Sequence, residues 1–304
     1  MLELEFAVNF LAATMRTATP LLIASLGLVY SERSGIVNIG TEGIMLSGAL
    51  LGCIGSLLFE SSLMGAAFAA AGGAILGIIF AFFTVTLRSS QVVVGFSMNI
   101  FAMGLTVTLN RLILDNVRVT AYPSFAIPGL SRIPVAGSQL FTWPLLVYFA
   151  LLAVPVSWFV LYKTNIGLKI RAVGDHPKAC DTVGINVFRI RYGAIIFSGV
   201  MSGLAGSFIS MGQLSMFVEN MVAGGGFMAL AVVVFGNYSP GSVLMASLLF
   251  GASDALKFRL LMTPAADYYQ FMNMLPYVIT IVALCFFARR SNKPAFSAVP
   301  YRKD

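Results

Sequence analysis

The chain has 304 residues, of which 58% are hydrophobic and only 10% are charged. Soluble domains carry about 25% charged residues, so this composition excludes an ordinary soluble protein and makes membrane lipid the main solvent. The formal net charge of +7 does not indicate nucleic acid as a partner, because six of the 19 basic residues lie in 163–191 and five in 289–304. Basic clusters placed between and after apolar segments are typical of membrane topology signals.

Apolar segments of membrane-spanning length follow one another along the chain. A helix needs about 20 mostly apolar residues to cross the hydrocarbon core. The candidate spans are residues 6–30, 41–59, 63–87, 92–114, 143–162, 192–211, 225–238, 240–257 and 271–288. We therefore expect an all-α, polytopic membrane helix bundle of about nine transmembrane helices, forming one domain over 1–288. A basic cytoplasmic tail over 289–304 follows it.

Orientation follows from the basic residues, which resist translocation and stay in the cytoplasm. This rule places the loop 163–191 and the tail 289–304 inside. Counting spans back from the loop places the segment 115–142 and the N-terminus outside. Five basic residues on the predicted outer side, among them Arg111, run against the rule.

Small residues recur inside the spans, where they let helices approach closely in lipid. We expect packing roles for Gly72, Gly73, Gly77, Gly199, Gly203 and Gly206. Two acidic residues lie instead where apolar segments are broken or short, near 31–42 and 219–238. They are Glu42 and Glu219. Paired broken segments in the two halves of a transporter indicate its pathway, but each carboxylate could equally cap a half-helix.

Other polar residues at membrane depth suit either packing or a polar solute. Asn38, Gln91 and Asn99 are uncharged hydrogen-bonding groups, whose ordinary role is to join helices. Asp254 and Lys257 are three residues apart on one predicted helix, so we expect them to form an ion pair.

The loop 163–191 contains the signals of a short capped helix. Asp175 is placed to N-cap it, Pro177 fits its first turn, and Gly184 can end it. A short helix on the cytoplasmic side is suited to docking a soluble partner. A plain solvated connector is the alternative, and the loop by itself does not decide between them.

Motifs for energy conversion and catalysis are missing from the sequence. It has no GxxxxGK[ST] phosphate-binding loop and no GxSxG nucleophile motif, and its one histidine, His176, cannot form a histidine-rich metal site. We therefore expect no enzyme activity, no cofactor and no metal. A secondary transporter, a channel, or the membrane half of a transporter powered by another chain remain.

Four stretches carry a resemblance to a known family: SERSGIVNIGTEGIMLSGAL (31–50), SSQVVVGFSMNIFAMGL (89–105), NIGLKIRAVGDHPKACDTVGINVFRIRYGAIIFSGVMSGLAG (165–206) and FVENMVAGGGFMALAVVVFGNYSPGSVLMASLLFGASDAL (217–256). Together they resemble permease subunits of bacterial ABC importers of the branched-chain amino acid and simple-sugar superfamily. The nucleoside importer branch is the most similar. The resemblance covers about residues 25 to 288. It implies a multi-pass protein of the bacterial inner (plasma) membrane.

The resemblance also implies roles for individual residues. The family's cytoplasmic coupling loop, which seats on the nucleotide-binding subunit, is matched by Gly167, Arg171, Gly174, Asp175, Pro177 and Gly184. The broken-helix motifs match at 35–40 and 224–227, and the pathway that they imply includes Asn38, Glu42, Asn99 and Glu219. Sugar permeases commonly have an acidic residue in place of Asn38, so the asparagine favours the nucleoside branch.

The resemblance implies that the chain passively translocates a small polar solute by alternating access. It favours a nucleoside as this solute. The partners implied are an ABC ATPase subunit, a second homologous permease chain, an extracytoplasmic solute-binding protein and membrane lipid. Two alternatives stay open. One is an ABC permease for simple sugars, and the other is a secondary transporter driven by an ion gradient through Glu42 or Glu219. The sequence does not separate a homodimer from a heterodimer.

Overall fold

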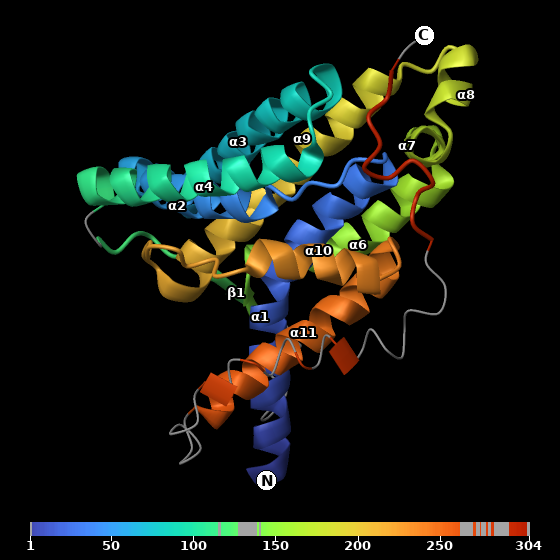
Figure 1. Ribbon diagram of the computed structural model, residues 1–304. Helices are drawn as coiled ribbons and strands as arrows, with labels where there is room; N and C mark the ends of the chain where they lie inside the picture. Colours follow the sequence, from blue (N-terminus) through green and yellow to red (C-terminus); the bar gives the residue numbers. More distant parts are fainter. Residues whose placement is uncertain are drawn as a thin grey trace.

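The computed structural model describes residues 2–114, 117–126, 141–261 and 292–302, with isolated positions at 139 and between 270 and 282 (Figure 1). Its long helices, in chain order, are α1 (Leu2–Arg33), α2 (Thr41–Phe59), α3 (Ser62–Ala81), α4 (Gln91–Leu109), α6 (Leu145–Lys163), α9 (Val187–Ser207) and α11 (Pro240–Leu260). The shorter ones are α7 (Asn165–Asp175), α8 (Pro177–Thr182) and α10 (Gly225–Phe235).

Three helices continue into π-helical turns, and two short strands complete the described fold. The turns are η1 (Phe82–Thr86) after α3, η2 (Asn110–Leu114) after α4 and η4 (Phe208–Leu214) after α9. The strands β1 (Ser124–Ala126) and β2 (Thr142–Pro144) pair antiparallel, with Phe125 opposite Trp143.

The expected all-α membrane bundle is confirmed, but the count of about nine spans is not. In the described part of the chain, six helices are long and apolar enough to cross a membrane. They are Ala7–Arg33, Thr41–Phe59, Ser62–Thr86, Gln91–Leu114, Leu145–Lys163 and Val187–Leu214. With 11 residues, α10 is shorter than a span needs. The expected ninth span, 271–288, lies outside the described residues except for isolated positions.

α11 is long enough to span but carries charges in its last turns. Nζ of Lys257 lies 3.0 Å from Oδ1 of Asp254, so the predicted ion pair is confirmed. Both side chains are about four-fifths buried. The pair neutralises two of the three charges, Asp254, Lys257 and Arg259, that α11 carries close to its end.

Glycines pack the bundle as expected. A Cβ added at Gly199 would collide with the backbone carbonyl of Gly73, and one at Gly203 with that of Ala69. A Cβ at Gly206 would collide with the carbonyl of Met45. α9 therefore contacts α3 and α2 backbone to backbone. This suits helices that associate by close packing in lipid.

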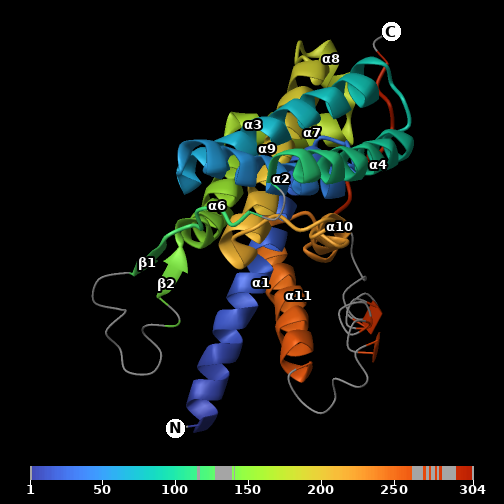
Figure 2. The same cartoon turned by 90° about the vertical axis from the view of Figure 1, so that its left-hand side faces the viewer.

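The two described ends of the chain lie far apart. Figures 1 and 2 show the N-terminus of α1 at one end of the molecule, with α7, α8 and the C-terminal segment at the opposite end. α1 and α11 run side by side below the group formed by α2, α3, α4 and α9 (Figure 2). This arrangement agrees with an N-terminus on the side opposite to the loop 163–191.

Candidate functional site

The chain is interrupted between α1 and α2, as the sequence predicts. α1 ends at Arg33, and Gly35 turns the chain with φ at +89°, in the left-handed region that favours glycine. The segment 34–40 that follows is not helical, so its backbone groups need other partners. Gln91 of α4 supplies one, because its Oε1 accepts a hydrogen bond from the N–H of Val37 at 2.9 Å.

Asn99 and Asn38 complete the support of this break. In Asn99, Oδ1 accepts from the N–H of Gly43 at 2.8 Å and Nδ2 donates to the carbonyl of Ile39 at 3.0 Å. Asn38 is fully buried, and its Oδ1 accepts from the N–H of Gly40 at 3.1 Å. The structure therefore brings both predicted pathway asparagines to one place. In this conformation both ends of the Asn99 amide hold backbone, whereas in Asn38 only Oδ1 does and the buried Nδ2 has no hydrogen-bond partner among the described residues.

Glu42 joins this break to the one in the second half of the chain. It lies in the first turn of α2, and its oxygens accept hydrogen bonds from Gly224 N–H at 2.8 Å and from Gly226 N–H at 2.6 Å. α10 begins at Gly225, so the carboxylate satisfies free N–H groups at the positive end of that half-helix. A Cβ at Gly226 would lie 2.5 Å from Cα of Glu42, so only glycine allows this approach. We call this contact the Glu42 junction.

Glu219 lies elsewhere. Its carboxylate pairs with Arg111, with 3.0 Å between Oε1 and Nε, and the two side chains are 40% and 71% exposed. The structure thus separates the two acidic residues that the sequence grouped as pathway candidates. Glu42 is an internal cap, and Glu219 forms a surface ion pair at the end of α4.

Two aromatic side chains beside the Glu42 junction escaped the sequence analysis. Phe96 of α4 and Phe227 of α10 each follow a glycine of the junction region, Gly95 and Gly226. Their ring centroids are 6.0 Å apart, and both rings are more than two-fifths exposed. Exposed phenylalanines are ordinary in a membrane span, so only their position next to the break distinguishes them.

The coupling loop folds into two helices, and the predicted N-cap at Asp175 is wrong. Asp175 is the last residue of α7. α7 begins at Asn165, where the Thr164 hydroxyl caps it by accepting from the N–H of Gly167 at 3.3 Å. The predicted short helix is the next one, α8, and its N-cap is His176. Ile170 and Val173 are buried at helical spacing inside α7, and their burial competes with a helix start at Asp175.

The rest of the predicted short helix is confirmed. Pro177 is the first residue of α8, which suits a residue without an N–H. Gly184 follows the end of this helix with φ at +83°.

Three predicted coupling residues seat α7 on the membrane domain. A Cβ at Gly174 would collide with the carbonyl oxygen of Arg33, and one at Gly167 with the backbone at the end of α6. The Arg171 guanidinium lies 5.0 Å from the ring centroid of Tyr162, within cation–π distance. These residues fix α7 against α6 and against the α1–α2 turn, which is where the break begins.

The outer side of α7 and α8 is apolar and open. Ile166, Leu168 and Val183 are 62%, 57% and 73% exposed. A hollow of about 540 Å³ lies between the two helices, lined by Asn165, Leu168, Lys169, Ala172, Asp175, His176, Ala179, Cys180, Val183 and Ile185. Burial raises the pKa of the Cys180 thiol, which therefore stays protonated near neutral pH. An exposed apolar surface rimmed by charges is typical of a protein interface.

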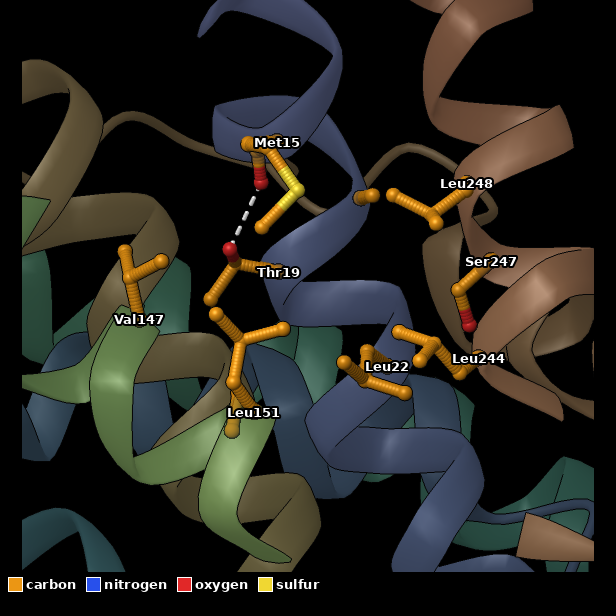
Figure 3. Close-up of a pocket in the computed structure, with 10 residues that line it drawn as sticks. Met15, Thr19, Leu22, Val147, Leu151, Leu244, Ser247 and Leu248 are labelled. Atoms are coloured by element: carbon orange, nitrogen blue, oxygen red, sulfur yellow. Dashed lines mark hydrogen bonds between the residues drawn. The ribbon is translucent and has the colours of Figure 1, made fainter. Parts of the chain in front are cut away.

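A second hollow lies between α1, α6 and α11 (Figure 3). Apolar side chains dominate its lining. The Thr19 hydroxyl in it bonds to the carbonyl of Met15 in its own helix at 2.6 Å. Its volume is only about 10 Å³, room for about one water molecule, so it is a packing defect rather than a solute site.

Comparison with known proteins gives a consistent result. The profile of the family "Branched-chain amino acid transport system / permease component" matches residues 10–284. The guanosine ABC transporter permease protein NupQ of Bacillus subtilis is 38% identical, over 96% of this chain and 95% of NupQ. The nucleoside ABC transporter permease protein NupC of Lactococcus lactis is 35% identical, over 94% of both chains. TsgC13 of Haloferax volcanii, whose name proposes glucose as the substrate, is 36% identical over 95% and 94%.

Proposed function

We propose, because this chain belongs to the branched-chain amino acid transport family of permease components, that it imports a nucleoside with energy from ATP hydrolysed by a partner subunit. A permease component is a multi-pass membrane protein and not itself an enzyme. The observation that carries the choice of cargo is the near full-length similarity to two permeases named for guanosine and for nucleosides.

The partners that we propose are those of an ABC importer. An ATPase subunit docks on α7 and α8, where Ile166, Leu168 and Val183 are exposed. A second homologous permease chain completes the pathway, and a solute-binding protein delivers cargo at the opposite face. In this topology the N-terminus lies outside, while 163–191 and 289–304 lie in the cytoplasm.

Energy reaches the pathway through contacts that the described residues make. A displacement of α7 moves the α1–α2 turn, because Gly174 lies directly against the carbonyl of Arg33. The turn leads into the segment 34–40 and then to Glu42, whose carboxylate holds the start of α10. Half-helices that meet near the centre of a transporter are where substrate pathways are generally formed. Tilting α7 would thus open or close the Glu42 junction.

The surroundings of the junction are compatible with a nucleoside. Phe96 and Phe227 present aromatic faces there, and a nucleobase stacks on such faces. Neither Asn38 nor Asn99 carries a charge, so they suit a neutral cargo.

An ion-driven mechanism through Glu42 has less support. Both of its carboxylate oxygens are occupied by backbone N–H groups of α10. Protonation of either oxygen would weaken the hydrogen bond that this oxygen accepts from α10, so a proton carried by Glu42 would act against the contact that holds the half-helix. Glu219 is an exposed partner of Arg111, away from the junction.

Uptake should therefore need ATP and a separate ATPase chain. We expect guanosine uptake in proteoliposomes that hold the whole complex with ATP on the ATPase side, and none with ADP. Glucose serves as the control solute. Guanosine uptake by this chain alone under a proton or sodium gradient would contradict the proposal. ATP-driven uptake of glucose but not of guanosine would replace the cargo and keep the mechanism.

The docking surface has its own test. Val183→Asp places a charge on an apolar side chain that is 73% exposed, so the membrane domain should fold normally. We expect the amount of ATPase that co-purifies with the permease to fall at least tenfold, or about 1.4 kcal/mol. Val183→Thr, which keeps the shape, is the matched control and should stay within about twofold of wild type. Equal ATPase binding by all three proteins would mean that α7 and α8 are only a connector.

A further inference from the structure

The C-terminal segment 292–302 is an ordered part of the fold rather than a free tail. It runs along the end of the molecule that holds α7 and α8, where its red trace is visible in Figures 1 and 2. Its residues are described from Asn292 to Arg302 and include the turn 295–298. The sequence indicated only a basic tail here, because the segment has no periodic apolar pattern.

This segment bonds to α7 and to the α1–α2 turn at once. The N–H of Phe296 donates to the carbonyl of Gly174 at 3.0 Å, and the N–H of Ala295 donates to Oδ1 of Asp175 at 3.3 Å. Two residues later, the N–H of Ala298 donates to the carbonyl of Gly35 at 3.0 Å. The last turn of the coupling helix and the first turn of the break therefore share one strap.

Arg191 of α9 also joins the α1–α2 turn to the strap. Its side chain is only 1% exposed, although it is one of the basic residues that sequence analysis assigned to a polar loop. Nε donates to the carbonyl of Ser34 at 3.2 Å, and Nη1 donates to that of Val299 at 3.3 Å. A single planar guanidinium thus bridges the α1–α2 turn and the strap, which a point charge does less well.

Both ends of the strap are anchored. Tyr301 is 7% exposed and packs with Val173, Cys180 and Val187, and its ring centroid lies 5.8 Å from that of Phe188. At the other end, the N–H of Asn292 donates to Oδ1 of Asn237, which follows α10, at 2.6 Å.

We infer that the strap 292–302 and Arg191 make α7, α8 and the α1–α2 turn move as one body, so that ATPase motion reaches the broken segment. The inference rests on the proposed function. In this arrangement Arg191 is a positioning residue, because it touches neither the solute nor the ATPase. Without the strap, α7 would still hold the ATPase through its exposed side. Its displacement would then reach 34–40 only through the contact of Gly174 with Arg33, which can push the turn but not pull it.

The test measures solute imported per ATP hydrolysed by the whole complex in proteoliposomes. The variants are Arg191→Met and a chain that ends at Ser291. Arg189→Met is the matched control, since Arg189 is an exposed arginine two residues away with the same change of charge. We expect both test variants to bind the ATPase and hydrolyse ATP within about twofold of wild type, while guanosine imported per ATP falls at least tenfold. Arg191→Lys should recover part of the ratio, and Arg189→Met should equal wild type.

The remaining outcomes distinguish the role of the strap from the docking surface and from the proposed function. A wild-type ratio of import to hydrolysis in both test variants overturns the inference, and so does loss of ATPase binding, because the strap would then belong to the docking surface. Where the shortened chain does not accumulate, Tyr301→Ala leaves the backbone donors of Ala295, Phe296 and Ala298 in place and should lower the ratio in the same direction. Failure of the wild-type complex to import with ATP would refute the proposed function, whereas a normal wild type beside unaffected variants refutes only the strap.

Discussion

Replacing Gly226 by alanine should abolish nucleoside uptake, whereas the same change at Gly225 should leave uptake within about twofold of wild type. The two glycines are adjacent in the first turn of α10, where alanine is preferred over glycine by up to about 1 kcal/mol. Their surroundings differ. A Cβ at Gly226 would lie 2.5 Å from Cα of Glu42, whereas the nearest atom to one at Gly225 is a side-chain methyl of Val222 at 3.3 Å.

The expected cause is displacement of α10 from the carboxylate that caps it. Uptake by the reconstituted complex, normalised to the permease in the membrane, measures the effect. Thermal unfolding in detergent shows whether the membrane domain itself survives. Wild-type uptake in Gly226→Ala would mean that transport does not need the close contact between Gly226 and Glu42, so that the Glu42 junction is not part of the pathway. Equal loss in both variants would point to the helix start in general rather than to this contact.

Removing the Glu42 carboxylate should have an effect of similar size. Glu42→Ala leaves two backbone donors of α10 without their acceptor. Hydrogen bonds to charged groups contribute about 1.5–3 kcal/mol each, so for two of them we expect a loss of about 3–6 kcal/mol in stability and of nearly all uptake. Glu42→Gln keeps one acceptor oxygen and should lose less of both.

Glu219→Gln is the matched control for Glu42. It breaks the ion pair with Arg111, but both side chains are exposed at the end of the span, and exposed pairs contribute little. We expect ATP-driven uptake close to wild type. The reverse pattern, with Glu219→Gln inactive and Glu42→Ala active, would move the pathway to the loop before α10. Loss of gradient-driven rather than ATP-driven uptake in Glu42→Gln would revive the ion-coupled alternative.

The sequence by itself determined the features that depend on neighbours along the chain. The apolar segments from 41–59 to 192–211 were long enough to predict helices. Whether a segment can lie in lipid depends on the residues of that segment alone. Gly35–Gly40 predicted the break, and Pro177 and Gly184 predicted the limits of α8, since those residue types act on their own backbone. The i, i+3 spacing of Asp254 and Lys257 was sufficient to predict an ion pair, which is found at 3.0 Å.

Only the tertiary structure decided which distant groups meet. Glu42 and Glu219 look alike in the sequence, yet one caps a helix 182 residues further along and the other forms a surface pair. Asp175 carries the signal of an N-cap, but burial of Ile170 and Val173 extends the helix through it. Arg191 and the strap gave no functional signal, because most of their hydrogen bonds involve backbone carbonyls or backbone N–H groups, which every residue type has. Hydrogen bonds between segments depend on how the chain packs, so the sequence around one partner does not identify the other partner.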